Sequence, residues 1–299
     1  MEHSGTARSA VAEGLPDAVH LQVEGREVAS YVWRSQLPAS TAPRPFIHPV
    51  RTLAGCLVTD ARPHSHTHQL GISIAAPDIG GRNFWGGRTF VAGHGPAWLD
   101  DHGVQRHRRW LRHTDSALEH TLQWVDADGT ALLLERRSIE CTPSSDEAWI
   151  LGVRTKLTNA TDQPLTIRSP AALGRVGAGY GGFFWRGPAP TEQVRVLSPA
   201  GTGPKAVNGT TASWVAVSSS DNDDREWTML FLPADATTAE DRWFVRAGDY
   251  LGVGSSLAWD RPLVLEPGAH ITRHILAVVA DGTLTEDAAA ALADAARPS

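Results

Sequence analysis

The segment Leu118–Cys141, LEHTLQWVDADGTALLLERRSIEC, decides the fold class. Its first part, up to Val125, reads as a β-strand. The polar stretch Asp126–Gly129 is typical of a turn, and Ala131–Cys141 reads as the returning strand. Two such strands joined by a short glycine-containing turn predict a β-hairpin.

The same pattern extends outward from this hairpin in both directions. Short strand-like runs separated by Gly, Pro, Asn and Asp turns begin at Ala18 and continue to Val279. Roughly fifteen such strands without an internal linker predict one all-β domain, a large β-sandwich. We expect a disordered tail over residues 1–17, the sandwich domain over 18–283, and a short C-terminal helix within 284–299. Thr285 can cap that helix, and the alanine-rich run after it favours helix.

Composition excludes several classes of partner. The chain has 299 residues and a net charge of −6, with no basic patch of the kind that nucleic acid requires. It contains no apolar run long enough to span a membrane, and its start does not resemble a signal peptide. We therefore expect a cytoplasmic protein that binds neither nucleic acid nor membrane. Cys56 and Cys141 are expected to form one disulfide or two buried thiols.

A histidine row near the first third of the chain is the strongest candidate for a functional site. His64, His66 and His68 alternate with other residues, so a strand would place all three on one face. A His-x-His pair suits a divalent transition metal, with His102, His107 or Glu135 as later ligands. The alternative is an exposed loop whose histidines bind nothing.

Two further clusters carry polar and aromatic groups. Asp101 and His102 are an adjacent acid and imidazole that suit acid–base chemistry, or they form a polar turn at His102-Gly103. In Gly179–Arg186, GYGGFFWR, Tyr180 and Trp185 could stack on a sugar ring. Arg186, with Arg175 upstream, could bind an oxyanion or hydroxyl groups. The alternative for this segment is a bulged core strand.

An ordered series of short motifs resembles a known family. It is Arg44-Pro-Phe-Ile-His-Pro-Val50, His66-Thr-His-Gln-Leu-Gly71, Asn83-Phe-Trp85, His102-Gly103, Arg175 with Tyr180–Arg186, and Trp243–Arg246. The series, from about Ala18 to Gly282, resembles a family of unknown function, DUF6807, which is often labelled "methane oxygenase PmoA". Gln69 and Leu70 depart from the family's usual HPHHRG pattern. A membrane oxygenase subunit would need spanning helices, which the label implies and the sequence lacks.

The resemblance implies a galactose mutarotase-like supersandwich and carbohydrate chemistry. It adds Arg44, His48 and Trp85 to the candidate substrate-binding residues, beside Arg175, Tyr180, Trp185 and Arg186. We expect a carbohydrate-active lyase or epimerase that performs acid–base chemistry on a sugar or keto-glycoside. Its predicted catalytic residues are His66, His68, His102 and His107, and a divalent metal would be held by His66, His68 and His102. The alternatives are a non-catalytic carbohydrate-binding protein and a cupin-like metal-dependent oxygenase.

Overall fold

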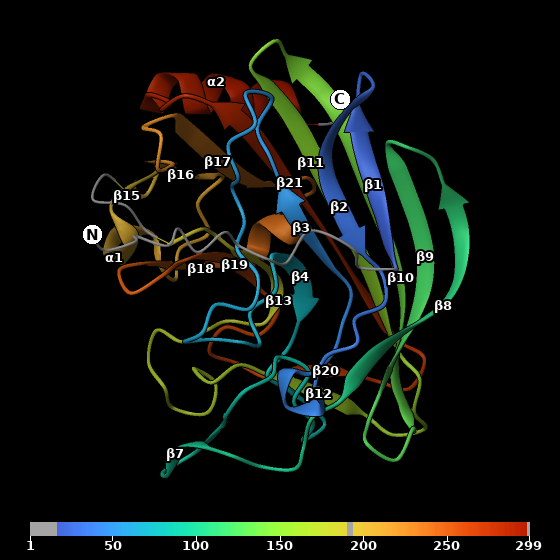
Figure 1. Ribbon diagram of the computed structural model, residues 1–299. Coiled ribbons are helices and arrows are strands. Elements are labelled where there is room, and N and C mark those ends of the chain that lie inside the picture. Colours follow the sequence, from blue (N-terminus) through green and yellow to red (C-terminus); the bar gives the residue numbers. More distant parts are fainter. Residues whose placement is uncertain (1–16, 190–193, 298–299) are drawn as a thin grey trace, which may run out of the picture.

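Two large antiparallel sheets pack face to face in the computed structural model, which describes residues 17–189 and 194–297 (Figure 1). The prediction of an all-β protein with a large β-sandwich is confirmed. The predicted disordered tail lies outside the described residues except for Asp17. No helix in the described part of the chain is long and apolar enough to cross a membrane.

The seven-stranded sheet has the order β1-β2-β3-β4-β13-β19-β18. Its strands are β1 (Ala18–Val23), β2 (Arg26–Val32), β3 (Phe46–Val50), β4 (Ile72–Ala75), β13 (Gly182–Arg186), β18 (Arg242–Ala247) and β19 (Leu251–Ser256).

The nine-stranded sheet has the order β15-β14-β16-β17-β21-β11-β10-β9-β8. Its strands are β8 (Val104–His113), β9 (Ala117–Val125), β10 (Ala131–Ser145), β11 (Ala148–Asn159), β14 (Arg195–Ser198), β15 (Gly201–Thr202), β16 (Val215–Ser220), β17 (Glu226–Pro233) and β21 (His270–Asp281). The predicted hairpin is β9–β10, in which Ala131 pairs with Val125.

Smaller elements complete the fold. They are a three-stranded sheet of β5 (Asp78–Ile79), β12 (Leu165–Arg168) and β20 (Leu263–Leu265), a hairpin of β6 (Thr89–Val91) and β7 (Gly95–Ala97), the helices α1 (Pro204–Val207) and α2 (Glu286–Ala296), and the 3-10 turns Ala39–Thr41 and Thr238–Glu240. The α2 helix is the predicted C-terminal helix. The Thr285 hydroxyl caps it by accepting a hydrogen bond from the Ala288 N–H at 3.2 Å. Its buried Ala289 and Ala293 belong to the apolar cluster on the outer face of the nine-stranded sheet.

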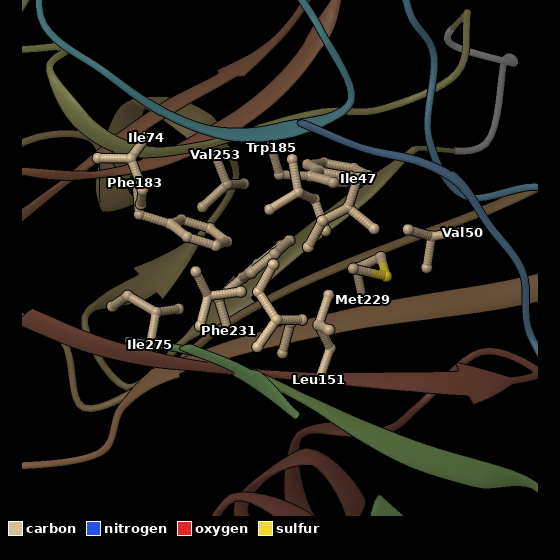
Figure 2. Close-up of a cluster of buried hydrophobic side chains, with 14 of the residues drawn as sticks. Ile47, Val50, Ile74, Leu151, Phe183, Trp185, Met229, Phe231, Val253 and Ile275 are labelled. Carbon is tan, nitrogen blue, oxygen red and sulfur yellow. The ribbon is translucent and has the colours of Figure 1, made fainter. Parts of the chain in front are cut away.

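The main core fills the space between the two large sheets (Figure 2). The seven-stranded sheet contributes Phe183 and Trp185 from β13, and the nine-stranded sheet contributes Met229 and Phe231 from β17. Because side chains alternate along a strand, the residues of β13 between these core positions face outward. Phe184 accordingly joins a separate aromatic cluster outside the core. Cys56 and Cys141 are buried free thiols, which decides between the two predicted alternatives.

A polar network is enclosed between the sheets beside this core. Arg137 donates from Nε to Glu135 Oε1 at 2.7 Å, and both side chains are almost completely buried. The Trp124 indole and the Thr155 hydroxyl also donate to Glu135, at 2.7 Å each. Glu135, weighed in the sequence as a metal ligand, is therefore fully engaged in holding β9, β10 and β11 together.

Buried histidines make the fold sensitive to acid. Burial, followed by nearby positive groups, lowers the pKa of His48 to about 4, of His68 to about 3 and of His120 to about 2. These rings stay neutral in the folded chain, whereas in the unfolded chain each takes up a proton below about pH 6.5. The stability that they contribute is therefore complete above about pH 6.5 and is lost as the pH falls toward the folded-state pKa values.

We expect the free energy of unfolding to drop by roughly 1.4 kcal/mol per pH unit for each such histidine below about pH 6. Urea unfolding between neutral pH and about pH 5 measures this slope. His120→Gln should reduce the slope of the free energy of unfolding against pH by the contribution of one histidine. A free energy of unfolding that stays constant over this interval would contradict the prediction.

Candidate functional site

A pocket of about 820 Å³ lies at one end of the seven-stranded sheet, on the side away from the core. Its sheet floor follows from the two-residue period of the strands. Phe244 and Arg246 of β18 alternate with the core residues Trp243 and Val245, so their side chains face the pocket. Loops supply the remaining walls. The pocket is lined by His64, Ser65, His66, Thr67, His68, Gln69, Trp85, Gly87, Arg88, Pro96, Trp98, Arg175, Ala178, Tyr180, Phe244, Arg246, Gly248, Asp249 and Tyr250.

The histidine row reaches this pocket, but not on a strand. The segment forms two consecutive turns, in which the His66 N–H bonds to Pro63 O and the Gln69 N–H bonds to His66 O, at 2.9 Å each. The predicted strand is therefore wrong, because local turn hydrogen bonds replace the strand ladder at Pro63. His64, His66 and His68 nevertheless all line the same pocket.

His66 and His68 differ in their surroundings. The two ring centres are 5.8 Å apart, and His66 is much less buried than His68. Burial, then the charges of Arg44, His66, His102 and Arg186, lowers the pKa of His68 to about 3. Burial and the Arg186 guanidinium also lower the pKa of His66, while Asp249 acts in the opposite direction. His68 is therefore a neutral imidazole at physiological pH.

A hydrogen bond to its backbone carbonyl and the close packing of two glycines hold His68 in place. The buried Arg44 guanidinium donates to His68 O at 2.8 Å and to Trp85 O at 3.0 Å. Arg44 was predicted to bind substrate, but it is 1 % exposed and its hydrogen bonds go to the protein. Gly87 passes directly beside the His68 ring, and Gly86 lies beside the His68 Cβ. A Cβ on Gly87 would lie 2.7 Å from His68 Nδ1.

This close approach predicts a difference between two glycines with nearly the same φ. Gly87 has φ +71° and Gly93 has φ +72°, but nothing lies within 4 Å of a Cβ built on Gly93. Gly93→Ala should cost only the left-handed strain of about 1–2 kcal/mol. Gly87→Ala should cost more and shift the NMR resonances of the His68 ring. Equal losses in urea unfolding, with unchanged His68 resonances, would show that the contact has no effect.

Tyr250 forms the wall next to His66, and Arg186 supports it from behind. The Arg186 guanidinium lies 4.7 Å from the Tyr250 ring centre and donates to Gln69 Oε1 at 2.8 Å. The His66 ring centre is 5.3 Å from that of Tyr250. Burial raises the pKa of the Tyr250 phenol, partly offset by Arg246 and Arg186. Arg186 thus lies behind the lining residues and acts through Gln69 and Tyr250.

Aromatic rings pack together in the inner part of the pocket. Trp85 lies 4.5 Å from Tyr180 and 4.8 Å from Phe184, measured between ring centres. The Asn83 side-chain oxygen accepts hydrogen bonds from the Trp85 and Gly86 backbone N–H groups at 2.8 Å each. The Asn83-Phe-Trp85 motif therefore fixes the turn that carries Trp85 into the pocket.

His102 lies behind the pocket wall. Its Nε2–H donates to Gly87 O at 2.8 Å, and its Nδ1 is 3.8 Å from Asp101 Oδ1. A nitrogen that donates to a carbonyl has no lone pair left for a metal. Within residues 17–189 and 194–297, no three His, Cys, Asp or Glu side chains are placed to hold one metal ion. The structure therefore does not assemble His66, His68 and His102 as a ligand set. The predicted turn at His102-Gly103 is also wrong, because His102 bridges to Asn83 just before β8.

Three other predicted residues lie away from the pocket. His107, on β8, bonds through Nδ1 to His120 Nδ1 at 2.9 Å and packs against Trp33 and Trp110. His48 is buried and bonds to the Thr59 hydroxyl at 2.9 Å. Trp185 is fully buried in the core, where its indole donates to Val58 O (Figure 2). Trp185 and Arg186 cannot share a face because adjacent residues of β13 point to opposite sides of the sheet.

The structure adds pocket residues that the sequence analysis did not select. They are Arg88, Trp98, Phe244, Arg246, Asp249 and Tyr250. Arg88 and Trp98 come from the β6–β7 hairpin region, and the other four come from β18 and the turn toward β19. The motif Trp243–Arg246 could have indicated two of them, since the two-residue period of a strand places Phe244 and Arg246 on one face. The contact of that face with the histidine segment depends on sheet order, which no local pattern shows.

Comparisons with known proteins place the chain in a family. A candidate aldose 1-epimerase from Escherichia coli K12 is similar in structure, with a TM-score of 0.47 and 11 % identity over 88 % of this chain and 98 % of that one. The heparan sulfate lyase HepC from Pedobacter heparinus gives a TM-score of 0.30 and 9 % identity over 61 % of this chain, which spans only 22 % of the lyase. No curated protein matches in sequence. The model of the DUF6807 family matches residues 18–294. The chain belongs to DUF6807, a family of unknown function.

Proposed function

We propose that the pocket binds a sugar and removes a proton from a carbon next to a carbonyl group. One observation carries the proposal: a histidine pair and a tyrosine stand together in the wall of a pocket that also presents aromatic faces. The His66 ring centre lies 5.8 Å from that of His68 and 5.3 Å from that of Tyr250. Convergent acid–base groups in a pocket are the usual mark of an active site.

The lining favours a polar ring-shaped ligand. Trp85, Tyr180 and Trp98 offer apolar faces, and Tyr and Trp combine such a face with a hydrogen-bonding group. Gln69, His64 and Thr67 add hydrogen-bonding groups at the wall. A pocket of about 820 Å³ accommodates a ligand the size of one or two sugar rings.

His66 is the better candidate for the general base. An efficient catalytic base has a pKa near the working pH. The pKa of His68, about 3, makes its neutral ring a weak base, whereas His66 is closer to solvent and has Asp249 nearby. We assign proton removal to His66 and the holding of substrate hydroxyls to His68. Among the described residues, the His68 ring has no hydrogen-bond partner, so it can bind substrate hydroxyls.

Proton removal by His66 opens either an epimerase or a lyase reaction. His66 takes the proton from the carbon, and the electron pair of the broken C–H bond moves into the adjacent carbonyl as an enolate. In an epimerase, the carbon then takes a proton on its opposite face from the Tyr250 phenol, and the protonated His66 returns its proton to the tyrosinate through solvent. In a lyase, the enolate re-forms the carbonyl as it expels the β-oxygen, which takes a proton from the Tyr250 phenol. Nearby positive charge, including Arg186, stabilises the enolate oxygen.

The test is exchange of the substrate proton with solvent. The protein is incubated in D₂O with glucose, galacturonate, glucuronate and methyl 3-keto-glucoside, and proton NMR follows the carbon next to the carbonyl. Ultraviolet absorbance follows formation of an unsaturated product. We expect deuterium incorporation or elimination with at least one compound, and His66→Gln should abolish it.

The same measurements identify the alternative, a non-catalytic carbohydrate-binding protein. Calorimetric binding of a sugar without exchange or elimination, unchanged by His66→Gln, would favour that function. The oxygenase alternative has less support, because His102 Nε2 is engaged with Gly87 O.

A further inference from the structure

We propose that the ligand of this pocket carries a negative charge, as a uronic acid or a sugar phosphate does. This inference deepens the proposed function and rests on the pocket that it uses. Three arginines line the pocket: Arg88, Arg175 and Arg246. The described lining includes a single carboxylate, that of Asp249. The chain as a whole has a net charge of −6, so the excess of positive charge is local.

The three arginines have no carboxylate partner within residues 17–189 and 194–297. Arg246 donates to neutral oxygens, namely Asn208 Oδ1 at 3.1 Å, Val245 O at 2.8 Å and Gly177 O at 2.8 Å. Arg88 lies 6.0 Å from the Trp98 ring centre, and Arg175 lies 6.0 Å from that of Phe90. Many arginines elsewhere in the chain pair with Asp or Glu, as Arg168 does with Asp78 at 2.7 Å.

A fourth cation lies behind the pocket. Arg44 is buried, and its five hydrogen bonds go to the Ser73 hydroxyl and to backbone carbonyls, including those of His68 and Trp85. Burial, and the charge of Arg137, lower its pKa to about 9, so it stays protonated at neutral pH. A charge in such a low-dielectric position acts on the pocket with little screening.

The depressed histidine pKa values agree with this positive field. Arg44 and Arg186 both contribute to lowering the pKa of His68, after burial. Anionic ligands are recognised by such convergent guanidinium groups, since planar N–H pairs match a carboxylate or phosphate. A neutral sugar would leave these cations without an anionic partner in the complex.

The test measures binding without requiring turnover. Isothermal titration calorimetry compares methyl β-D-glucuronide, methyl β-D-glucoside and glucose 6-phosphate. We expect at least one of the two anionic sugars to bind about tenfold more tightly than the neutral glycoside, with the advantage shrinking at high salt. The anion that binds more tightly identifies the source of the charge. Equal affinity of the neutral glycoside, or no preference for either anion, overturns the inference.

Variants that are expected to change the affinity for the anionic sugar in opposite directions exclude a general structural effect. Arg88→Gln and Arg175→Gln remove exposed charges and should each weaken binding of the anionic sugar by roughly threefold. Asp249→Asn removes the opposing carboxylate and should strengthen binding. Arg108→Gln, an exposed arginine of β8 outside the pocket, should leave affinity unchanged. Unchanged affinity in both pocket-arginine variants overturns the inference.

Two outcomes separate this inference from the proposed function. If an anionic sugar binds preferentially but shows no proton exchange, the charge preference stands and the proton-transfer function fails. If exchange occurs on a neutral sugar that binds as tightly as the anionic ones, the function stands and the charge preference fails.

Discussion

Replacing His66 with glutamine is expected to lower turnover by roughly 10²–10⁴-fold, the usual contribution of a general base. Glutamine keeps a hydrogen-bonding group of similar size but cannot accept a proton. Because His66 is only partly buried, the variant should fold normally. The affinity for substrate should change little, so the loss should appear in kcat rather than in KM.

A matched substitution separates catalysis from a surface effect. His94→Gln changes an exposed histidine of the β6–β7 hairpin that does not line the pocket, and it should leave kcat unchanged. The His66-dependent activity should also decline as the pH falls, because protonation removes the base. Turnover in His66→Gln equal to that of the parent chain would refute the assignment of His66 as the base.

Replacing Arg137 with methionine is expected to cost about 3–5 kcal/mol of folding stability. The exposed fractions of the Arg137 and Glu135 side chains are 1 % and 0 %. Arg137 bonds to both carboxylate oxygens, at 2.7 and 2.8 Å, so its removal leaves a buried charge without its partner. Urea unfolding monitored by tryptophan fluorescence measures the loss.

The neighbouring arginine provides the control. Arg136, the next residue back along β10, pairs with Glu119 of β9 on the exposed face of the sheet, and Arg136→Met should cost far less stability than Arg137→Met. Adding Glu135→Gln to Arg137→Met should recover part of the loss, since the unpaired charge is then gone. Losses of similar size in the two single variants would contradict a special role of the buried pair.

The fold could be predicted from local patterns, because strands show a two-residue period and turns show characteristic residues in the sequence. The β9–β10 hairpin and the capped α2 helix depend only on residues near one another in the chain. The histidine segment failed as a strand because Pro63 and the polar residues after it form turns, which alternation alone does not reveal. Alternation of residue types is therefore weak evidence for a strand where turn-forming residues are frequent.

The pocket was only partly predictable for a different reason. Tyr180, His66 and His68 were found because their residue types suggest ligand binding, and Trp85 was found through the family resemblance. Arg246 and Tyr250 were missed because they reach the pocket through the pairing order β4-β13-β19-β18, which joins distant segments. Trp185 and His107 were misplaced because residue type says nothing about which face of a strand a side chain occupies.

The alternation in β13 and β18 has a consequence for how this protein can change. Trp185 and Trp243 hold the sheets together, while Phe184 and Phe244 lie on the opposite face and support the pocket. Ligand preference can therefore be altered at one set of positions while the other set keeps the fold, so new specificities are accessible through point substitutions. Deleting one residue from β13 would exchange the two sets and damage both properties at once.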